Sequence, residues 1–132
     1  EVISGLKTSA ETIENVKELL SSIGILCEVI NDNPGFVSNR LSHIFMNEAA
    51  TLVQEGVATA EQIDSIFKNG FGHAMGPLQT ADLIGLDVVV NSLEVLLDSY
   101  NDPKYNPCPL LRRMVSAGML GRKSGQGFYK YK

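Results

Sequence analysis

The residues best placed to do chemistry follow a break in the chain near residue 34. Pro34 and Gly35 interrupt the backbone, and a long amphipathic helix then begins with two polar residues, Asn39 and Arg40, in its first turns. Polar side chains at the start of a helix that follows a hinge are well placed to face a cleft. We therefore expect this stretch, residues 33–41, to border a functional site.

The two histidines could supply acid–base chemistry, but neither has a suitable partner nearby in the sequence. His43 follows Asn39 by four residues on the same helix face, without a carboxylate or cysteine at partner spacing, which favours a histidine packed in a core or an interface. His73 lies in a glycine-rich loop and could titrate near neutral pH, although a solvated loop residue is the simpler interpretation. The residues alone therefore predict no complete catalytic set.

Motifs for a cofactor or a metal are missing from the sequence. Gly125-Gln126-Gly127 lacks the third glycine of the G-x-G-x-x-G fingerprint and follows no predicted strand, and K-S at residues 123–124 lacks the glycine spacing of a P-loop. Cys27 and Cys108 stand far apart, with no second cysteine pair or histidine cluster to complete a metal site. We expect no bound metal, and two reduced thiols in a cytoplasmic protein.

The elements that must position these residues fall into two groups. Residues 1–32 have the pattern strand, helix, strand: a strand end at residues 1–3, a helix that begins at a capping box with Thr8 as its cap and stops at Gly24, and a β-rich run over residues 25–30. Two strands cannot make a stable sheet alone. We therefore expect this segment to be the end of an α/β domain whose upstream part is missing, or to pair with another chain.

Five helical patterns follow residue 36 and predict a small helical domain. The longest has an apolar face from Leu41 to Val53, widened by Met46 and Ala50, which is typical of a helix buried in the domain centre or in a subunit interface. Turn and cap residues mark the other boundaries: a second capping box at Thr59, a stop near Gly70, starts at Pro77, Asp87 and Pro109, and an extended segment at residues 128–131.

Composition and charge narrow the class of protein. The 132 residues suffice for one compact domain, and no run approaches the roughly 18 apolar residues of a membrane span. From Arg112 onward there are six basic residues and no acid, whereas the preceding part holds five basic and fifteen acidic residues. The basic end could receive an anion such as a nucleotide phosphate, but pairing with acidic surface of its own or a neighbouring subunit is the simpler interpretation. We expect no nucleic acid as a partner, because the body is acidic and no aromatic residues are interleaved with the basic ones.

Three motifs in order give the chain a resemblance to a known family. N-P-G-F-V-S-N-R at residues 33–40 resembles the D-x-P-G-F-x-x-N-R motif of the 3-hydroxyacyl-CoA dehydrogenases. M-G-P-L at 75–78 and D-L-I-G-L-D at 82–87 are similar to that family's M-G-P-[FL] and D-x-x-G-L-D. G-R-K-S-G-Q-G-F-Y at 121–129 looks like its closing G-[RK]-K-[ST]-G-x-G-F-Y. The short bacterial 3-hydroxybutyryl-CoA dehydrogenases are the branch that the chain resembles most.

The resemblance implies a fold and a domain organisation. Residues 1–32 would be the C-terminal remnant of an NAD-binding Rossmann domain. Residues 33–132 would form a mainly α substrate and dimerisation domain, like the C-terminal domain of 6-phosphogluconate dehydrogenase. NAD would be bound by the missing N-terminal domain, which in the family also holds a His–Glu pair, a Ser and the glycine fingerprint. We therefore expect the chain alone to be inactive and to form a homodimer through its long helices.

The same resemblance implies the reaction, the oxidation of the 3-hydroxyl of an acyl thioester to a ketone, as in fatty acid metabolism. Asn39 matches the family's catalytic Asn, and its amide would donate a hydrogen bond to the oxygen at C3. Met75 and Pro77 would border the acyl pocket, with plain packing between domains as the alternative. The expected substrate is an acyl-CoA; the alternatives are an acyl-carrier-protein thioester in polyketide extender-unit biosynthesis, or a non-enzymatic dimerisation module. We expect no membrane partner.

Overall fold

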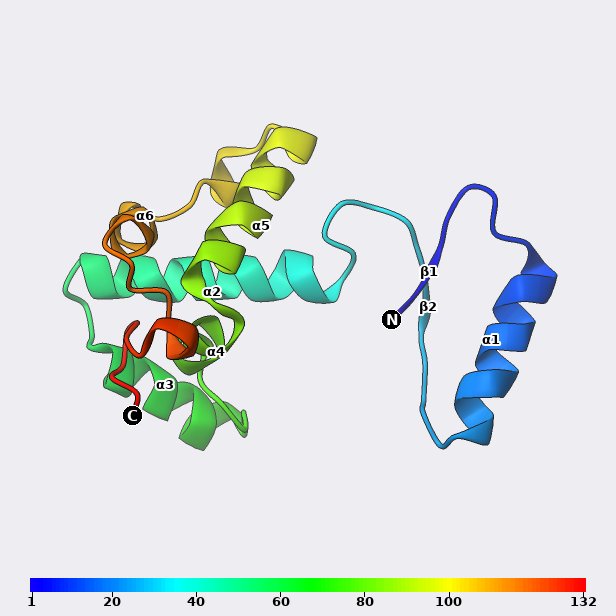
Figure 1. Ribbon diagram of the computed structural model, residues 1–132, viewed down its shortest axis with the longest axis horizontal. Helices are drawn as coiled ribbons and strands as arrows, with labels where there is room; N and C mark the ends of the chain where they lie inside the picture. The colour runs from blue at the N-terminus through cyan, green and yellow to red at the C-terminus, as the bar shows by residue number, and fades with distance from the viewer. The chain divides into compact units, whose positions relative to one another are not determined.

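Helices dominate the fold, as the mainly α prediction requires. The computed structural model describes every residue of the chain, 1–132, and separates it into two units, Glu1–Val37 and Ser38–Lys132 (Figure 1). None of the helices combines the length and the apolar character needed to cross a membrane. The two units are described in turn.

The first unit consists of β1 (Val2–Ser4), α1 (Ala10–Ser22) and β2 (Val29–Asn31). The two strands are parallel, with Val2 opposite Val29, and parallel strands need a crossover, which α1 supplies. The predicted order of strand, helix and strand is therefore confirmed. The predicted second strand was too long, because residues 25–28 lie outside β2.

The start of α1 differs from the sequence-based expectation by one residue. The N-cap is Ser9, whose hydroxyl accepts a hydrogen bond from the backbone N–H of Thr12 at 3.1 Å. The Thr8 hydroxyl instead accepts from the N–H of Gly5. Thr8 and Ser9 carry the same capping group, so the sequence pattern could not choose between two adjacent hydroxyls.

The second unit is built from five α-helices, which confirms their predicted number. α2 (Ser38–Gln54) crosses the unit in Figure 1, and the remaining four pack against it. Two short 3-10 turns complete the unit. The remaining elements are α3 (Ala60–Phe71), α4 (Pro77–Ile84), α5 (Leu86–Tyr100), η1 (Pro103–Tyr105), α6 (Pro109–Ser116) and η2 (Arg122–Ser124).

The buried face of α2 is rotated from the one that the apolar pattern predicts. Leu41 is 66% exposed, whereas Met46 and the polar residues His43 and Asn47 are buried. The polar residues can be buried because the backbone supplies partners: Asn47 donates to the carbonyl of Asn106 at 3.0 Å and accepts from the N–H of Cys108 at 2.7 Å. Satisfied polar groups can therefore occupy a core face in place of apolar ones.

Several local signals were read correctly from the sequence. At Thr59 both hydrogen bonds of the capping box with Gln62 are present. Pro77 and Pro109 each stand in the first turn of a helix, where the missing proline N–H costs nothing. These features depend on residues within one turn of each other, which explains why the sequence predicted them.

One predicted boundary was correct to within a residue and another was wrong. α3, predicted to stop near Gly70, ends at Phe71, and Gly72 follows it in the left-handed conformation with φ of 71°. Asp87 does not cap α5, because that helix already begins at Leu86, and Asp87 forms an ion pair with Lys123 at 2.5 Å instead. A residue 36 positions away thus decides the role of Asp87.

The C-terminal tail is bent where an extended segment was predicted at residues 128–131. The N–H of Gly127 donates to the carbonyl of Tyr129 at 2.9 Å, and Gln126 forms isolated bridges with Gly121 and Lys130. The tail bends in this way because the backbone N–H groups of Phe128 and Tyr129 both donate to the buried carboxylate of Asp82. The preceding turn-like stretch was predicted correctly.

Candidate active site

A half-enclosed cavity of about 220 Å³ lies between α2, α4 and the loop that precedes α4. Met75 and Pro77, the two residues proposed from the resemblance to border an acyl group, both line it. The remaining lining residues come from α2, from the loop and from α4: Ser42, Phe45, Met46, His73 and Thr80. The cavity is therefore mainly apolar, with two hydroxyls and one imidazole at its wall.

Four aromatic rings form one wall of this cavity and the surface beside it. Phe45 meets Phe67 edge-on with ring centroids 4.6 Å apart, and Phe67 stacks on Phe71 at 4.9 Å. The imidazole of His73 lies within 6.5 Å of all three rings. His73 is exposed, as the loop interpretation predicts, but it is packed against an aromatic cluster as well as solvated.

Asn39 lies in the first turn of α2, one turn before the cavity. Residues three apart on a helix are neighbours on its surface, so Asn39 adjoins Ser42, which lines the cavity. The Asn39 side chain is exposed, and its backbone carbonyl accepts a hydrogen bond from Nδ1 of His43 at 2.8 Å. Asn39 itself is not among the residues that line the cavity.

His43 is a core residue, as its sequence context predicts, but only one of its nitrogens is satisfied. A carbonyl can only accept, so the bond to Asn39 fixes the proton on Nδ1 and leaves Nε2 as an acceptor, which is buried without a hydrogen-bond partner. Burial lowers the pKa of His43, and the bond to the Asn39 carbonyl opposes this only in part. The imidazole is therefore neutral, and it holds the first turn of α2 together.

Arg40 does not border the cavity, contrary to the expectation for the first turn of α2. Its guanidinium donates to the hydroxyl of Tyr105 at 2.7 Å and to that of Tyr100 at 3.2 Å, and it stacks 4.2 Å from the centre of the Tyr100 ring. These contacts tie the start of α2 to α5 and η1. The role of Arg40 is therefore to fix the helix that carries Asn39.

Asp64 is a residue whose role the sequence did not reveal. It is 1% exposed, and its carboxylate accepts from the N–H of Leu78 at 2.8 Å and of Gln79 at 2.9 Å. It thereby caps α4 from a neighbouring helix, and its negative charge lies at the positive end of that helix. The same carboxylate accepts from the hydroxyl of Tyr129 at 2.6 Å.

Asp82 plays the matching part for the tail. Its carboxylate accepts from the N–H of Phe128 and of Tyr129, each at 3.0 Å, and from the hydroxyl of Tyr131 at 2.9 Å. Burial and the bond to Asp82 raise the pKa of Tyr131 to about 12, so this phenol remains a donor at physiological pH. A Cβ added at Gly127 would overlap the Asp82 carboxylate, which explains a glycine at this position.

Two motif glycines, Gly76 and Gly127, are each packed against a buried carboxylate. A Cβ on Gly76, in M-G-P-L, would overlap Asp64, just as one on Gly127 would overlap Asp82. Gly76 has φ of −73°, which any residue adopts, so close approach and not backbone conformation requires glycine there. An unexplained glycine beside a proline was the available signal for Asp64.

Three of the six basic residues from Arg112 onward have partners within the chain. Lys123 forms its ion pair with Asp87, Arg112 approaches Glu94 at 2.5 Å, and the guanidinium of Arg122 lies 5.4 Å from the centre of the Tyr131 ring. These contacts favour the interpretation of the basic end as a partner for the chain's own acidic surface. No group of three or more His, Cys, Asp or Glu side chains could hold a metal ion.

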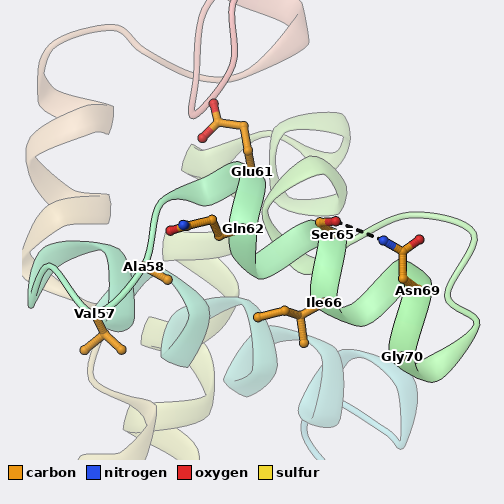
Figure 2. A pocket seen from close by; sticks show the side chains of 8 residues that line it. All are labelled: Val57, Ala58, Glu61, Gln62, Ser65, Ile66, Asn69 and Gly70. Carbon is orange, nitrogen blue, oxygen red and sulfur yellow. Dashed lines mark hydrogen bonds between the residues drawn. The ribbon is translucent and has the colours of Figure 1, made fainter.

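A second, wider depression of about 890 Å³ lies on the outer side of α3 (Figure 2). It contains none of the predicted site residues. Its lining includes one charged side chain, Glu61, and two exposed aliphatic ones, Val57 and Ile66, with exposed fractions of 65% and 56%. This surface has the character of a contact face rather than of a site for chemistry.

Comparison with known proteins identifies the family. Residues 35–131 match the model of the 3-hydroxyacyl-CoA dehydrogenase C-terminal domain. The chain is 54% identical over 131 residues to a probable 3-hydroxybutyryl-CoA dehydrogenase of Deinococcus radiodurans, covering 99% of this chain and 47% of that protein. A probable 3-hydroxybutyryl-CoA dehydrogenase of Bacillus subtilis is 53% identical, with 99% and 46% covered. The chain thus spans about half the length of these relatives.

A solved structure agrees with this assignment. The (S)-3-hydroxybutyryl-CoA dehydrogenase of Ralstonia eutropha superposes with a TM-score of 0.94 at 45% identity, covering 98% of this chain and 46% of that one. The residues that match the family model include Asn39, Met75 and Pro77, and the two buried aspartates Asp64 and Asp82. The chain therefore belongs to the 3-hydroxyacyl-CoA dehydrogenase family and carries its C-terminal domain.

Proposed function

We propose that the chain is the substrate-binding half of an NAD-dependent 3-hydroxyacyl-CoA dehydrogenase of the cytoplasm, which oxidises the 3-hydroxyl of a 3-hydroxybutyryl-CoA-like thioester. One observation carries the proposal. Met75 and Pro77 of one family motif line an apolar cavity whose other wall is α2, the helix that carries Asn39 of another motif in its first turn. The relatives that match almost the whole chain are named for this activity.

The domain assignment follows from the unfinished character of the first unit. Its sheet has only two strands, and it leaves Leu6, Leu19 and Leu26 exposed at 103%, 62% and 99%. Such a unit gains stability by joining a larger sheet. We assign residues 1–32 to the end of a Rossmann domain and residues 33–132 to the helical substrate domain.

The described residues do not fit NAD. The turn after β1 has one glycine, Gly5, in place of a glycine-rich fingerprint, and Gly121 and Gly127 are pressed against Asp82 and cannot cradle a phosphate. NAD binding therefore belongs to a domain outside these residues. The acceptors of the hydride from C3 and of the hydroxyl proton belong there too, and the chain alone is inactive.

Asn39 contributes electrostatic stabilisation at the reacting oxygen. Its exposed amide donates a hydrogen bond to the oxygen at C3, which becomes a carbonyl as the substrate is oxidised. A donor of this kind contributes about 3 kcal/mol to barrier lowering when it is aligned in advance. The alignment comes from α2, whose first turn is held by the His43 bond to the Asn39 carbonyl and by Arg40.

The cavity receives the acyl chain. Phe45, Met46, Met75 and Pro77 supply apolar contacts, and burying a methylene group is worth about 0.8 kcal/mol. The Thr80 hydroxyl is occupied by a 2.8 Å bond to the carbonyl of Gly76, so it adds no free donor to the wall. The lining is thus suited to a hydrocarbon chain.

The protein acts as a homodimer that forms through its helices. The depression along α3 offers exposed aliphatic side chains and a single charge, Glu61, so a second copy of the same face meets little repulsion. Exposed aliphatic side chains beside polar ones, here Gln62, Ser65 and Asn69, are typical of interaction surfaces. Light scattering at micromolar concentration should give twice the monomer mass, and a monomer would contradict the dimer.

The activity is tested with the protein that joins this chain to its cofactor domain. We expect NADH-dependent reduction of acetoacetyl-CoA, followed at the NADH absorbance, and no reduction by the 132-residue chain alone. The same assay with the acetoacetyl group on a carrier protein distinguishes the two thioester carriers. No turnover of either thioester by the joined protein would refute the proposed function. Turnover by the chain alone would refute the assignment of NAD binding to another domain.

A further inference from the structure

The carboxylate of Asp64 links three parts of the chain that are remote in sequence. It belongs to α3, it accepts from two backbone N–H groups at the start of α4, and it accepts from the hydroxyl of Tyr129 in the tail. The Oδ2 atom receives both the Gln79 N–H and the Tyr129 hydroxyl. A buried carboxylate with three donors is held in one position, because each lost bond would leave a buried polar group unpaired.

The two N–H groups that Asp64 binds belong to Leu78 and Gln79, the first two residues after Pro77. Gly76, between these two cavity residues, lies so close to Asp64 that a Cβ would overlap it. Asp64 is thus in contact with, or bonded to, the backbone from residue 76 to residue 79. The position of this carboxylate therefore fixes how Met75 and Pro77 face the cavity.

Tyr129 is held at two points and so transmits the position of the tail to Asp64. Its backbone N–H is bound by Asp82, and its hydroxyl is bound by Asp64. Burial and the Asp64 carboxylate raise the pKa of Tyr129, which keeps the phenol protonated. Tyr131 resembles it chemically but donates to Asp82 only, and Asp82 binds none of the residues that line the cavity.

We propose that Asp64 and Tyr129 are positioning residues of the acyl cavity, so that the C-terminal tail controls substrate binding through the start of α4. The proposal rests on the proposed function for the identity of the ligand, but not for the coupling itself. The tail then has a role in substrate binding in addition to its contribution to the stability of the fold. The proposal also separates the two tail tyrosines, of which only Tyr129 is bonded to Asp64.

The coupling is tested by comparing Tyr129→Phe with Tyr131→Phe in the 132-residue chain. Each change removes one phenolic hydroxyl from one buried carboxylate, so the two variants are matched. With methyl-labelled methionine, we expect the Met75 methyl resonance to shift in Tyr129→Phe and to stay in place in Tyr131→Phe. Equal shifts in both variants, or no shift in either, would overturn the proposal without reference to any activity.

Kinetics of the joined protein give the second readout. We expect Tyr129→Phe to raise the KM for acetoacetyl-CoA about tenfold, as for one lost hydrogen bond to a charged group, with kcat within about twofold. Tyr131→Phe should leave both constants within about twofold. A loss in kcat alone, or equal losses in the two variants, would show a merely structural role and would also overturn the proposal.

Hydrogen exchange in the unmodified chain covers the case in which Tyr129→Phe fails to fold. Three backbone N–H groups should exchange with the same opening free energy if the coupling holds. They are those of Leu78 and Gln79, which Asp64 binds, and that of Tyr129, which Asp82 binds. Independent opening of the tail, with the start of α4 still protected, would contradict the coupling. An absence of turnover in the unmodified joined protein would count only against the proposed function.

Discussion

The hydroxyl of Tyr129 donates to the carboxylate of Asp64 across 65 positions of sequence, at 2.6 Å. This bond joins the last motif of the family to the helix that precedes M-G-P-L. The tail is thereby part of the structure around the cavity and not an appendage. Through Asp64 the bond also links the closing motif to the start of α4, because Asp64 binds the N–H groups of Leu78 and Gln79.

Asp64→Ala should destabilise the helical unit by about 3–5 kcal/mol, because it removes the acceptor of three buried donors. Urea denaturation followed by circular dichroism measures the change. Asp98→Ala, at an exposed position of α5, is the matched control and should change the unfolding free energy by less than about 0.5 kcal/mol. Equal effects of the two substitutions would contradict the role given to Asp64.

Gly76→Ala should also destabilise the chain, by about 1–3 kcal/mol, since the added methyl overlaps Asp64 and must displace it. Gly70→Ala is the control. Gly70 lies within α3, has nothing within 4 Å of an added Cβ and needs no positive φ, so alanine there should stabilise by up to about 1 kcal/mol. Thermal unfolding of the two variants should therefore shift in opposite directions. Shifts of the same sign would show that Gly76 is not held by contact.

His43 should make stability depend on pH below about 6.5, the ordinary pKa of histidine. Its folded pKa is lowered by burial, so the unfolded chain binds the proton more readily. The stabilising contribution is thus complete above the unfolded pKa and is lost as the pH falls from there through the lower folded pKa. Urea denaturation between pH 7.5 and 5 should show a steeper loss for the unmodified chain than for His43→Gln. A parallel pH dependence of the two proteins would contradict this account, and His73→Gln serves as the control.

The local parts of this fold could be predicted from sequence, and the contacts between distant segments could not. The capping box at Thr59 and the prolines that open α4 and α6 depend on neighbouring residues. Leu41 belonged to the predicted apolar face but is exposed, whereas the polar residue Asn47 is buried. The backbone partners of Asn47, at Asn106 and Cys108, lie 59 and 61 positions along the chain, so only the fold supplies them.

The same distinction applies to the site. Met75 and Pro77 were proposed from a motif, and the structure brings them to one cavity. Asp64 was missed because its bonds reach 14, 15 and 65 positions along the chain. Nothing in the composition of α3 distinguishes this aspartate from an exposed one. The one sequence feature that pointed to Asp64 is Gly76, where a larger residue would overlap this aspartate.

Asn39→Ala in the protein that joins this chain to its cofactor domain tests the central claim most directly. We expect kcat for acetoacetyl-CoA reduction to fall about a hundredfold, the loss of one aligned donor at the reacting oxygen, with the thermal unfolding temperature unchanged. Asn91→Ala, the same substitution at an exposed position of α5, should leave kcat as it is. Unchanged turnover in Asn39→Ala would contradict the claim that this domain contributes a catalytic donor.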